Sequence, residues 1–167
     1  MIHHPLIIYK NCSKNSVSSY GIPCQCVELI RRYFNLYFGL TFKSIKDATE
    51  MFYKINFLTN ITKQAVALYT INAGNVEPAT IIIQVGDIIF WKKNKINGYY
   101  GHVGIVVYVT NETIIIAQQN AKTGLEEYRI SDIMYEMNKP DSPFLGIKRL
   151  PSFVIIPQQI EVIIKDE

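Results

Sequence analysis

The chain has 167 residues, of which 49% are hydrophobic and 19% charged, with a formal net charge of +3. This composition excludes disorder as the overall state and this length fits one domain. The charge is too small and too scattered for the basic stripe of a nucleic-acid-binding protein, and no apolar run reaches the ~18 residues that span a membrane.

No basic leader precedes a long apolar run at the N-terminus, so we expect no signal peptide. We therefore expect a cytoplasmic, reducing location or, for a viral protein, the virion or the host-cell interior. The three cysteines cannot all pair. A disulfide between Cys24 and Cys26 would be strained. We interpret Cys12 and Cys24 as bystanders.

The first third of the chain has a helical pattern. In residues 24–38, apolar side chains recur at intervals of three and four residues, between a Gly-Ile-Pro turn and Gly39. A second helix is expected to begin at Ser44, with Asp47 three residues further on as a weak variant of a capping box. The apolar face of this second helix consists of Ile45, Ala48, Met51, Phe52 and Ile55.

From residue 79 onwards the pattern is that of β-strands, whereas residues 56–78 fit no single pattern. Because a helical half followed by strands is typical of α+β proteins, we predict N-terminal helices packed on an antiparallel sheet. The tail is apolar enough to add strands or to pair with a partner. Strands are predicted at residues 80–84, 88–91, 102–109, 113–118 and 144–150, with others around Val154 and Val162.

Cys26 is the candidate nucleophile because it stands in the first turn of the first helix. A helix N-terminus carries about half a positive charge, which stabilises a thiolate. The amide of Gln25 could donate a hydrogen bond to an oxyanion. The alternative is that Cys26 is a small buried residue on the apolar face of the helix.

His102 is the candidate base, at the start of an apolar strand that follows Tyr99-Tyr100-Gly101. If residues 102–109 and 113–118 form a hairpin, Gln118 lies near His102. Its amide could then accept a hydrogen bond from the imidazole and fix the tautomer. Taken alone, His102 is better explained as a surface or core histidine without a catalytic role, and the alternative for Gln118 is an ordinary exposed strand end.

Together these segments resemble the CHAP family, the cysteine- and histidine-dependent amidohydrolases/peptidases. The resemblance covers about residues 18–150 of a single domain, 1–167, and leaves 151–167 as a C-terminal extension. The branch that it resembles most is the amidase domain of glutathionylspermidine synthetase/amidase, and it implies a papain-like fold. The matching segments are residues 25–33, 41–48, 85–91, 101–106, 116–120 and 144–147.

The resemblance implies a thiol hydrolase. Cys26 would be the nucleophile and His102 the general base and acid, and the backbone N–H of Cys26 would form an oxyanion hole with Gln25. Those amidases usually carry glutamate at the third position, where this chain has Gln118. A neutral amide can orient the imidazole but stabilises its charged form less, and Asn120 is a second candidate for orienting it. No Asp-rich calcium loop of the kind found in some phage members precedes Cys26, so we expect no metal and no other cofactor.

The sequence leaves three functions open. The favoured substrate is glutathionylspermidine or a related peptide amide, because the chain shows neither a secretion signal nor a wall-binding module. The second is a peptidoglycan cross-bridge or stem peptide, as in phage lysins. The third is a catalytically weak or inactive binding module, for which Gln118 is the support.

Overall fold

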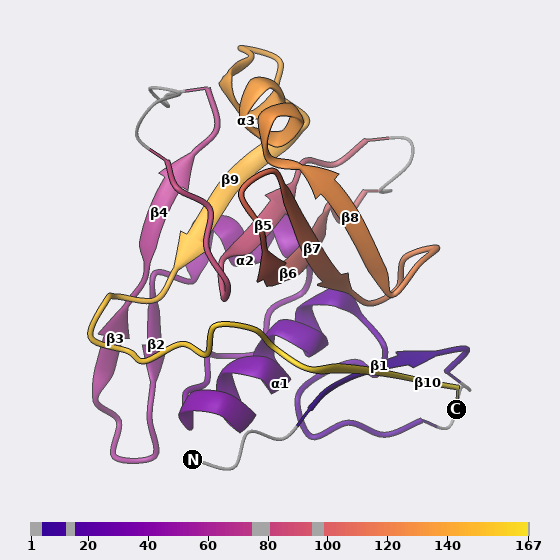
Figure 1. The fold of residues 1–167 in the computed structure, drawn as a ribbon. Coiled ribbons are helices and arrows are strands. Elements are labelled where there is room, and N and C mark those ends of the chain that lie inside the picture. Colours follow the sequence, from indigo (N-terminus) through magenta and orange to yellow (C-terminus); the bar gives the residue numbers. More distant parts are fainter. Residues whose placement is uncertain (1–4, 13–15, 75–80, 95–98, 167) are drawn as a thin grey trace.

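The computed structural model describes residues 5–12, 16–74, 81–94 and 99–166. Within these residues, a six-stranded antiparallel sheet has the order β4-β9-β5-β6-β7-β8 (Figure 1). Two smaller pairs accompany it, an antiparallel β2–β3 and a parallel β1–β10. In chain order the elements are β1 (Leu6–Lys10), α1 (Cys26–Phe38), α2 (Ala48–Lys54), β2 (Phe57–Thr59), β3 (Ala65–Ala67), β4 (Tyr69–Asn72), β5 (Ile88–Trp91), β6 (His102–Val109), β7 (Thr113–Gln118), β8 (Leu125–Arg129), α3 (Ile130–Asn138), β9 (Phe144–Arg149) and β10 (Val162–Asp166).

The first predicted helix is confirmed as α1, and it ends where glycine permits it to end. Gly39 adopts a left-handed conformation with φ 63°. Its N–H donates to Asn35 O, and the N–H of Leu40 donates to Phe34 O. These two bonds satisfy carbonyl groups that the end of a helix leaves without partners.

The second helix begins later than predicted. Its N-cap is Asp47, whose carboxylate accepts from the N–H of Glu50 (2.8 Å). The carboxylate of Glu50 in turn accepts from the N–H of Lys46 (2.9 Å). The capping arrangement therefore exists, but three residues beyond Ser44. The predicted apolar face is buried from Ala48 to Ile55, and Ile45 packs against it.

The strands that carry or adjoin His102 and Gln118 are confirmed, because β5, β6 and β7 have the expected bounds. The strand predicted at residues 80–84 is wrong: residues 81–84 are irregular, and residue 80 lies outside the described part. Side chains, instead of a neighbouring strand, form hydrogen bonds with the backbone of this segment. The N–H of Gln84 donates to Asp87, and Ile82 O accepts from Arg149 (2.7 Å).

The tail forms one of the expected strands. Val154 lies in a turn, so the strand predicted around it is wrong. The strand around Val162 is β10, which pairs in parallel with β1 at the other end of the described chain. The strands β2, β3 and β4 occupy the segment that fitted no single pattern. β8 and α3 lie where the sequence predicted no element.

Two hydrophobic clusters are separated by the large sheet. Alternate side chains of β5 divide between them: Ile88 and Phe90 pack with residues of α1 and α2, whereas Ile89 packs with residues of α3. This is the alternation of an extended strand. The molecule is thus a mixed α/β protein with a large antiparallel sheet, compatible with the papain-like fold that the resemblance implies.

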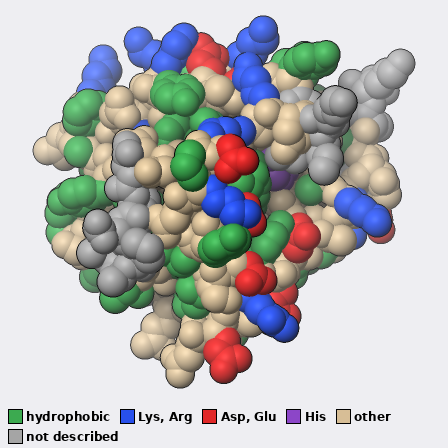
Figure 2. Space-filling view, turned by 90° about the horizontal axis from the view of Figure 1, so that it is seen from above, with side chains coloured by type: hydrophobic (Ala, Val, Ile, Leu, Met, Phe, Trp, Pro, Cys, Tyr) green, Lys and Arg blue, Asp and Glu red, His purple; other side chains and the backbone are tan. Residues whose placement is uncertain are grey.

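No described helix is both long and apolar enough to cross a membrane. On the face shown in Figure 2, Lys and Arg side chains lie among Asp and Glu side chains. In the C-terminal half of the chain, Lys139 pairs with Glu136, and Arg149 pairs with the buried Asp87.

Candidate active site

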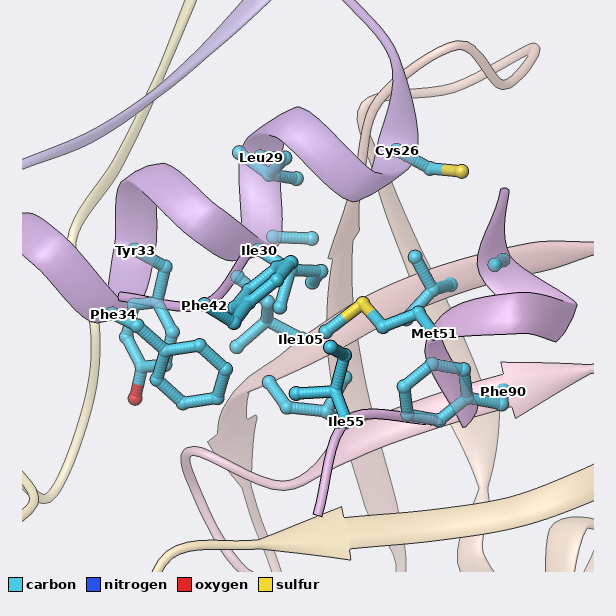
Figure 3. Packing of buried hydrophobic residues seen from close by; sticks show 14 of the residues in the cluster. Cys26, Leu29, Ile30, Tyr33, Phe34, Phe42, Met51, Ile55, Phe90 and Ile105 are labelled. Atoms are coloured by element: carbon cyan, nitrogen blue, oxygen red, sulfur yellow. The ribbon is translucent and has the colours of Figure 1, made fainter. Parts of the chain in front are cut away.

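Cys26 is the first residue of α1 and lies at the edge of the cluster formed with α1 and α2 (Figure 3). Its side chain is buried, with 8% exposed. The thiol lies close to the backbone N–H groups of Val103, Val27 and Cys26 itself, which stabilise its charged form. Because Val103 directly follows His102 in β6, this contact brings the first turn of α1 against the start of that strand.

Burial dominates the titration of this thiol. It raises the pKa of Cys26 to about 11, and the carboxylate of Asp47 adds to the rise. The N–H groups of Val103 and Val27 lower the pKa, but by less than burial raises it. The expected effect of the helix N-terminus is therefore outweighed. At neutral pH the resting group is a thiol, and its activation needs a base.

His102 begins β6, and its side chain meets Gln118 as expected. Its Nε2 lies 2.9 Å from Oε1 of Gln118, at the end of β7. An amide oxygen only accepts hydrogen bonds, so Nε2 carries the proton and Nδ1 is the basic nitrogen. Burial lowers the pKa of His102, while the hydrogen bond to Gln118 and the charge of Glu126 raise it.

A glycine sets the entry into β6. Gly101 has φ +69°, and a Cβ on it would lie 2.8 Å from the carbonyl oxygen of Trp91. Only glycine fits this approach without a shift of the backbone. The ring of Trp91 lies 5.6 Å from that of His102, centroid to centroid, so the imidazole is flanked by an apolar surface.

The two remaining predicted site residues contact each other. Nδ2 of Asn120 donates to Oε1 of Gln25 (3.0 Å). Because the oxygen of Gln25 is engaged, its amide nitrogen is turned away from Asn120. Asn120 thus orients the amide predicted to face an oxyanion, instead of the imidazole.

A buried polar cluster, which the sequence analysis missed, fixes α1 to the end of β7. Its members, Glu28, Arg32 and Gln119, are each at most 5% exposed. Arg32 pairs with Glu28 (3.0 Å) and donates to Gln119 (3.1 Å), and Gln119 donates to Glu28 (2.8 Å). Buried charges are tolerated only when they are paired in this way. The signal in the sequence was the Glu–Arg pair four residues apart.

The predicted site residues line one cleft of about 1170 Å³, namely Gln25, Cys26, His102, Gln118 and Asn120. A second hollow of about 580 Å³ shares Gln25, Cys26 and Tyr100 with it. Cys26 therefore lies where two hollows meet. Residues 8–12, from β1 and its extension, form part of the wall of the larger one.

A disulfide joins this wall to the segment before the nucleophile. Cys12 and Cys24 are bonded, with 6.2 Å between their Cα atoms, and Cys26 is free. The interpretation of Cys12 and Cys24 as bystanders is therefore wrong. Their pairing depends on β1 lying beside α1, a contact between segments for which the sequence carries no local pattern.

Among the described residues, no group of three or more His, Cys, Asp or Glu side chains is arranged to hold a metal ion. A family model described as the CHAP domain matches residues 15–120, well over half of the chain. The match contains Cys26, His102 and Gln118. No curated protein matches the chain significantly. The family match implies a hydrolase of the amidase or peptidase type.

Proposed function

The chain belongs to the CHAP family, and we propose that it is a thiol amidohydrolase in which Cys26 attacks the carbonyl of a peptide-type amide. One observation carries the proposal. Cys26 and His102 line the same cleft, and the thiol reaches the N–H of the residue that follows His102. Because Nε2 of His102 donates its proton to Gln118, Nδ1 of the imidazole is left as the base.

The reaction begins from a neutral pair. Nδ1 of His102 takes the thiol proton as Sγ adds to the carbonyl carbon. The backbone N–H of Cys26 and the amide of Gln25 donate to the oxyanion. The imidazolium then protonates the leaving nitrogen, the C–N bond breaks and a thioester forms. Water, deprotonated by His102, hydrolyses this thioester and restores the thiol.

A resting pair of neutral thiol and neutral imidazole is consistent with Gln118 at the position where the related amidases usually carry glutamate. The pKa of Cys26 is about 11, and that of His102 lies below its usual 6.5. Proton transfer from the thiol to the imidazole is therefore uphill before substrate binds. The attacking thiolate is thus formed in the course of the reaction and does not accumulate at rest.

The shape of the site supports a substrate that extends on both sides of the scissile bond. Because Cys26 lies where two hollows meet, each hollow can hold one side of the amide. The Cys12–Cys24 disulfide supports an oxidising location, since disulfides are rare in the reducing cytosol. We therefore place a peptidoglycan stem or cross-bridge peptide before glutathionylspermidine as the substrate.

The test is hydrolysis of both substrates by the wild-type protein and by the Cys26→Ala variant. Mass spectrometry would measure soluble peptides released from purified peptidoglycan, and spermidine released from glutathionylspermidine. We expect release from peptidoglycan that Cys26→Ala abolishes. Release that survives Cys26→Ala contradicts the mechanism, and release of spermidine alone contradicts the choice of substrate.

A further inference from the structure

The neutral Gln118 is itself held by a carboxylate on the neighbouring strand. Its Nε2 donates to Oε2 of Glu126 on β8 (2.7 Å), while its Oε1 faces His102. In the β7–β8 ladder Glu126 lies opposite Ile116, two residues before Gln118 on the same face. Glu126 is thus one hydrogen bond further from the imidazole than Gln118.

We propose that Glu126 is a positioning residue that acts on His102 through Gln118. The inference rests on the proposed function. A carboxylate accepts hydrogen bonds and has none to donate at neutral pH, so only the NH₂ end of Gln118 can face it. Glu126 therefore turns the oxygen of Gln118 toward His102. A reversed amide would direct NH₂ at Nε2 and favour the wrong tautomer of the imidazole.

The surroundings allow Glu126 to act by charge as well as by geometry. Gln118 is 4% exposed, so the bonds that it makes lie mostly out of water. The hydroxyl of Tyr128 is also hydrogen-bonded to Glu126. The ring of Trp91 lies beside the rings of both His102 and Tyr128, at 5.6 and 6.4 Å.

The other ionisable groups around the imidazole do not explain a change in the pKa of His102 when Glu126 is replaced. Cys26 lines the same cleft as His102 from α1 and is neutral below a pKa of about 11. Tyr128 lines this cleft from β8, and burial raises the pKa of its hydroxyl, so it too stays neutral. Lys10 and Lys122 line the same cleft and are retained in every variant proposed below.

The neighbouring residue provides a matched control. Glu127 follows Glu126 on β8 and is also exposed, but successive side chains of a strand lie on opposite faces. Glu127→Gln removes the same charge from the same strand without touching Gln118. Glu126→Gln removes the charge that acts on the imidazole but leaves an amide oxygen that can still accept from Gln118.

The first experiment measures the pKa of His102 by NMR titration of its ring protons, assigned with a His102→Asn variant. Since Glu126 is solvent-exposed, we expect Glu126→Gln to lower this pKa by only about 0.5 unit. Glu127→Gln should leave it unchanged. An unchanged pKa in Glu126→Gln, or an equal fall in Glu127→Gln, overturns the proposal.

The second experiment exchanges the amide of Gln118 and the carboxylate of Glu126. In the Gln118→Glu/Glu126→Gln double variant the carboxylate contacts His102 directly and the amide lies outside it. We expect Glu126→Gln to lower kcat about threefold, the rate equivalent of 0.5 pKa unit, with KM unchanged. The double variant should bring the pKa of His102 at least back to its wild-type value and restore kcat, and a pKa that stays as low as in Glu126→Gln overturns the proposal.

The proposed function and the positioning role of Glu126 can be refuted independently of each other. The NMR titration requires no turnover, so a lowered pKa in Glu126→Gln supports the relay whatever the substrate. Hydrolysis that survives Cys26→Ala would contradict the proposed function and leave that pKa result standing. Thermal unfolding of each variant shows that the fold is retained.

Discussion

Lys148 provides a test of the physical reasoning that is independent of the active site. Its side chain is 1% exposed, near the end of β9. The ammonium donates to Asn56 Oδ1 (3.0 Å) and Thr70 Oγ1 (2.9 Å), and lies 5.3 Å from the ring centre of Phe52. These partners are neutral, and burial lowers the pKa of Lys148 to about 8.

The sign of the effect follows from linkage. Unfolding returns Lys148 to its usual pKa of 10.5, so the unfolded chain binds the proton more tightly than the folded one. Below pH 8 the folded state carries the full cost of the buried charge. As the pH rises from 7 to 10 this cost is relieved, and the free energy of unfolding should increase by about 2.5 kcal/mol.

The assay is urea unfolding of the wild type and of Lys148→Met at pH 7, 8, 9 and 10. Methionine fills a similar volume without a charge, so groups that titrate in both proteins cancel in the difference. We expect the wild type to gain about 2.5 kcal/mol relative to the variant across this range. A difference that does not change with pH would refute the argument that burial depresses the pKa of Lys148.

Three further predictions follow from buried groups. The hydroxyl of Tyr33 is buried and without a hydrogen-bond partner in the described residues, so Tyr33→Phe should raise the free energy of unfolding by about 1 kcal/mol; a loss in urea unfolding would contradict this. The Cys12→Ser/Cys24→Ser variant should lose about 2–3 kcal/mol of unfolding free energy. The unreduced, denatured wild type should show one reactive thiol by Ellman titration, and three thiols would contradict the disulfide. Because the pKa of Cys26 is about 11, the rate of its alkylation by iodoacetamide should rise steadily from pH 7 to 10; a plateau below pH 8 would instead reveal a thiolate at rest.

Local patterns predicted much of the scaffold around the site. The helical spacing of residues 24–38 and the β-branched runs of β5, β6 and β7 are signals within one segment, and these elements have the expected places. The contact between His102 and Gln118 followed from the hairpin that these strands form. Each of these predictions needed only neighbours in the sequence.

The features that were missed depend on segments far apart in the chain. β1 pairs with β10, and Cys12 reaches Cys24 because β1 lies beside α1. The helix N-terminus was expected to lower the pKa of Cys26, but the packing that buries the thiol raises it. Glu126 had no signal of its own, because β8 was not predicted.

The central claim is that Cys26 forms the covalent intermediate, and trapping it is the most direct test. The unreduced protein would be mixed with a peptide p-nitrophenyl ester, quenched in acid, and analysed by intact mass and peptide mapping. We predict one acyl group on Cys26, formed more slowly in His102→Ala and absent in Cys26→Ala. Ester turnover without acylation of Cys26, or acylation at an equal rate without His102, would contradict the account.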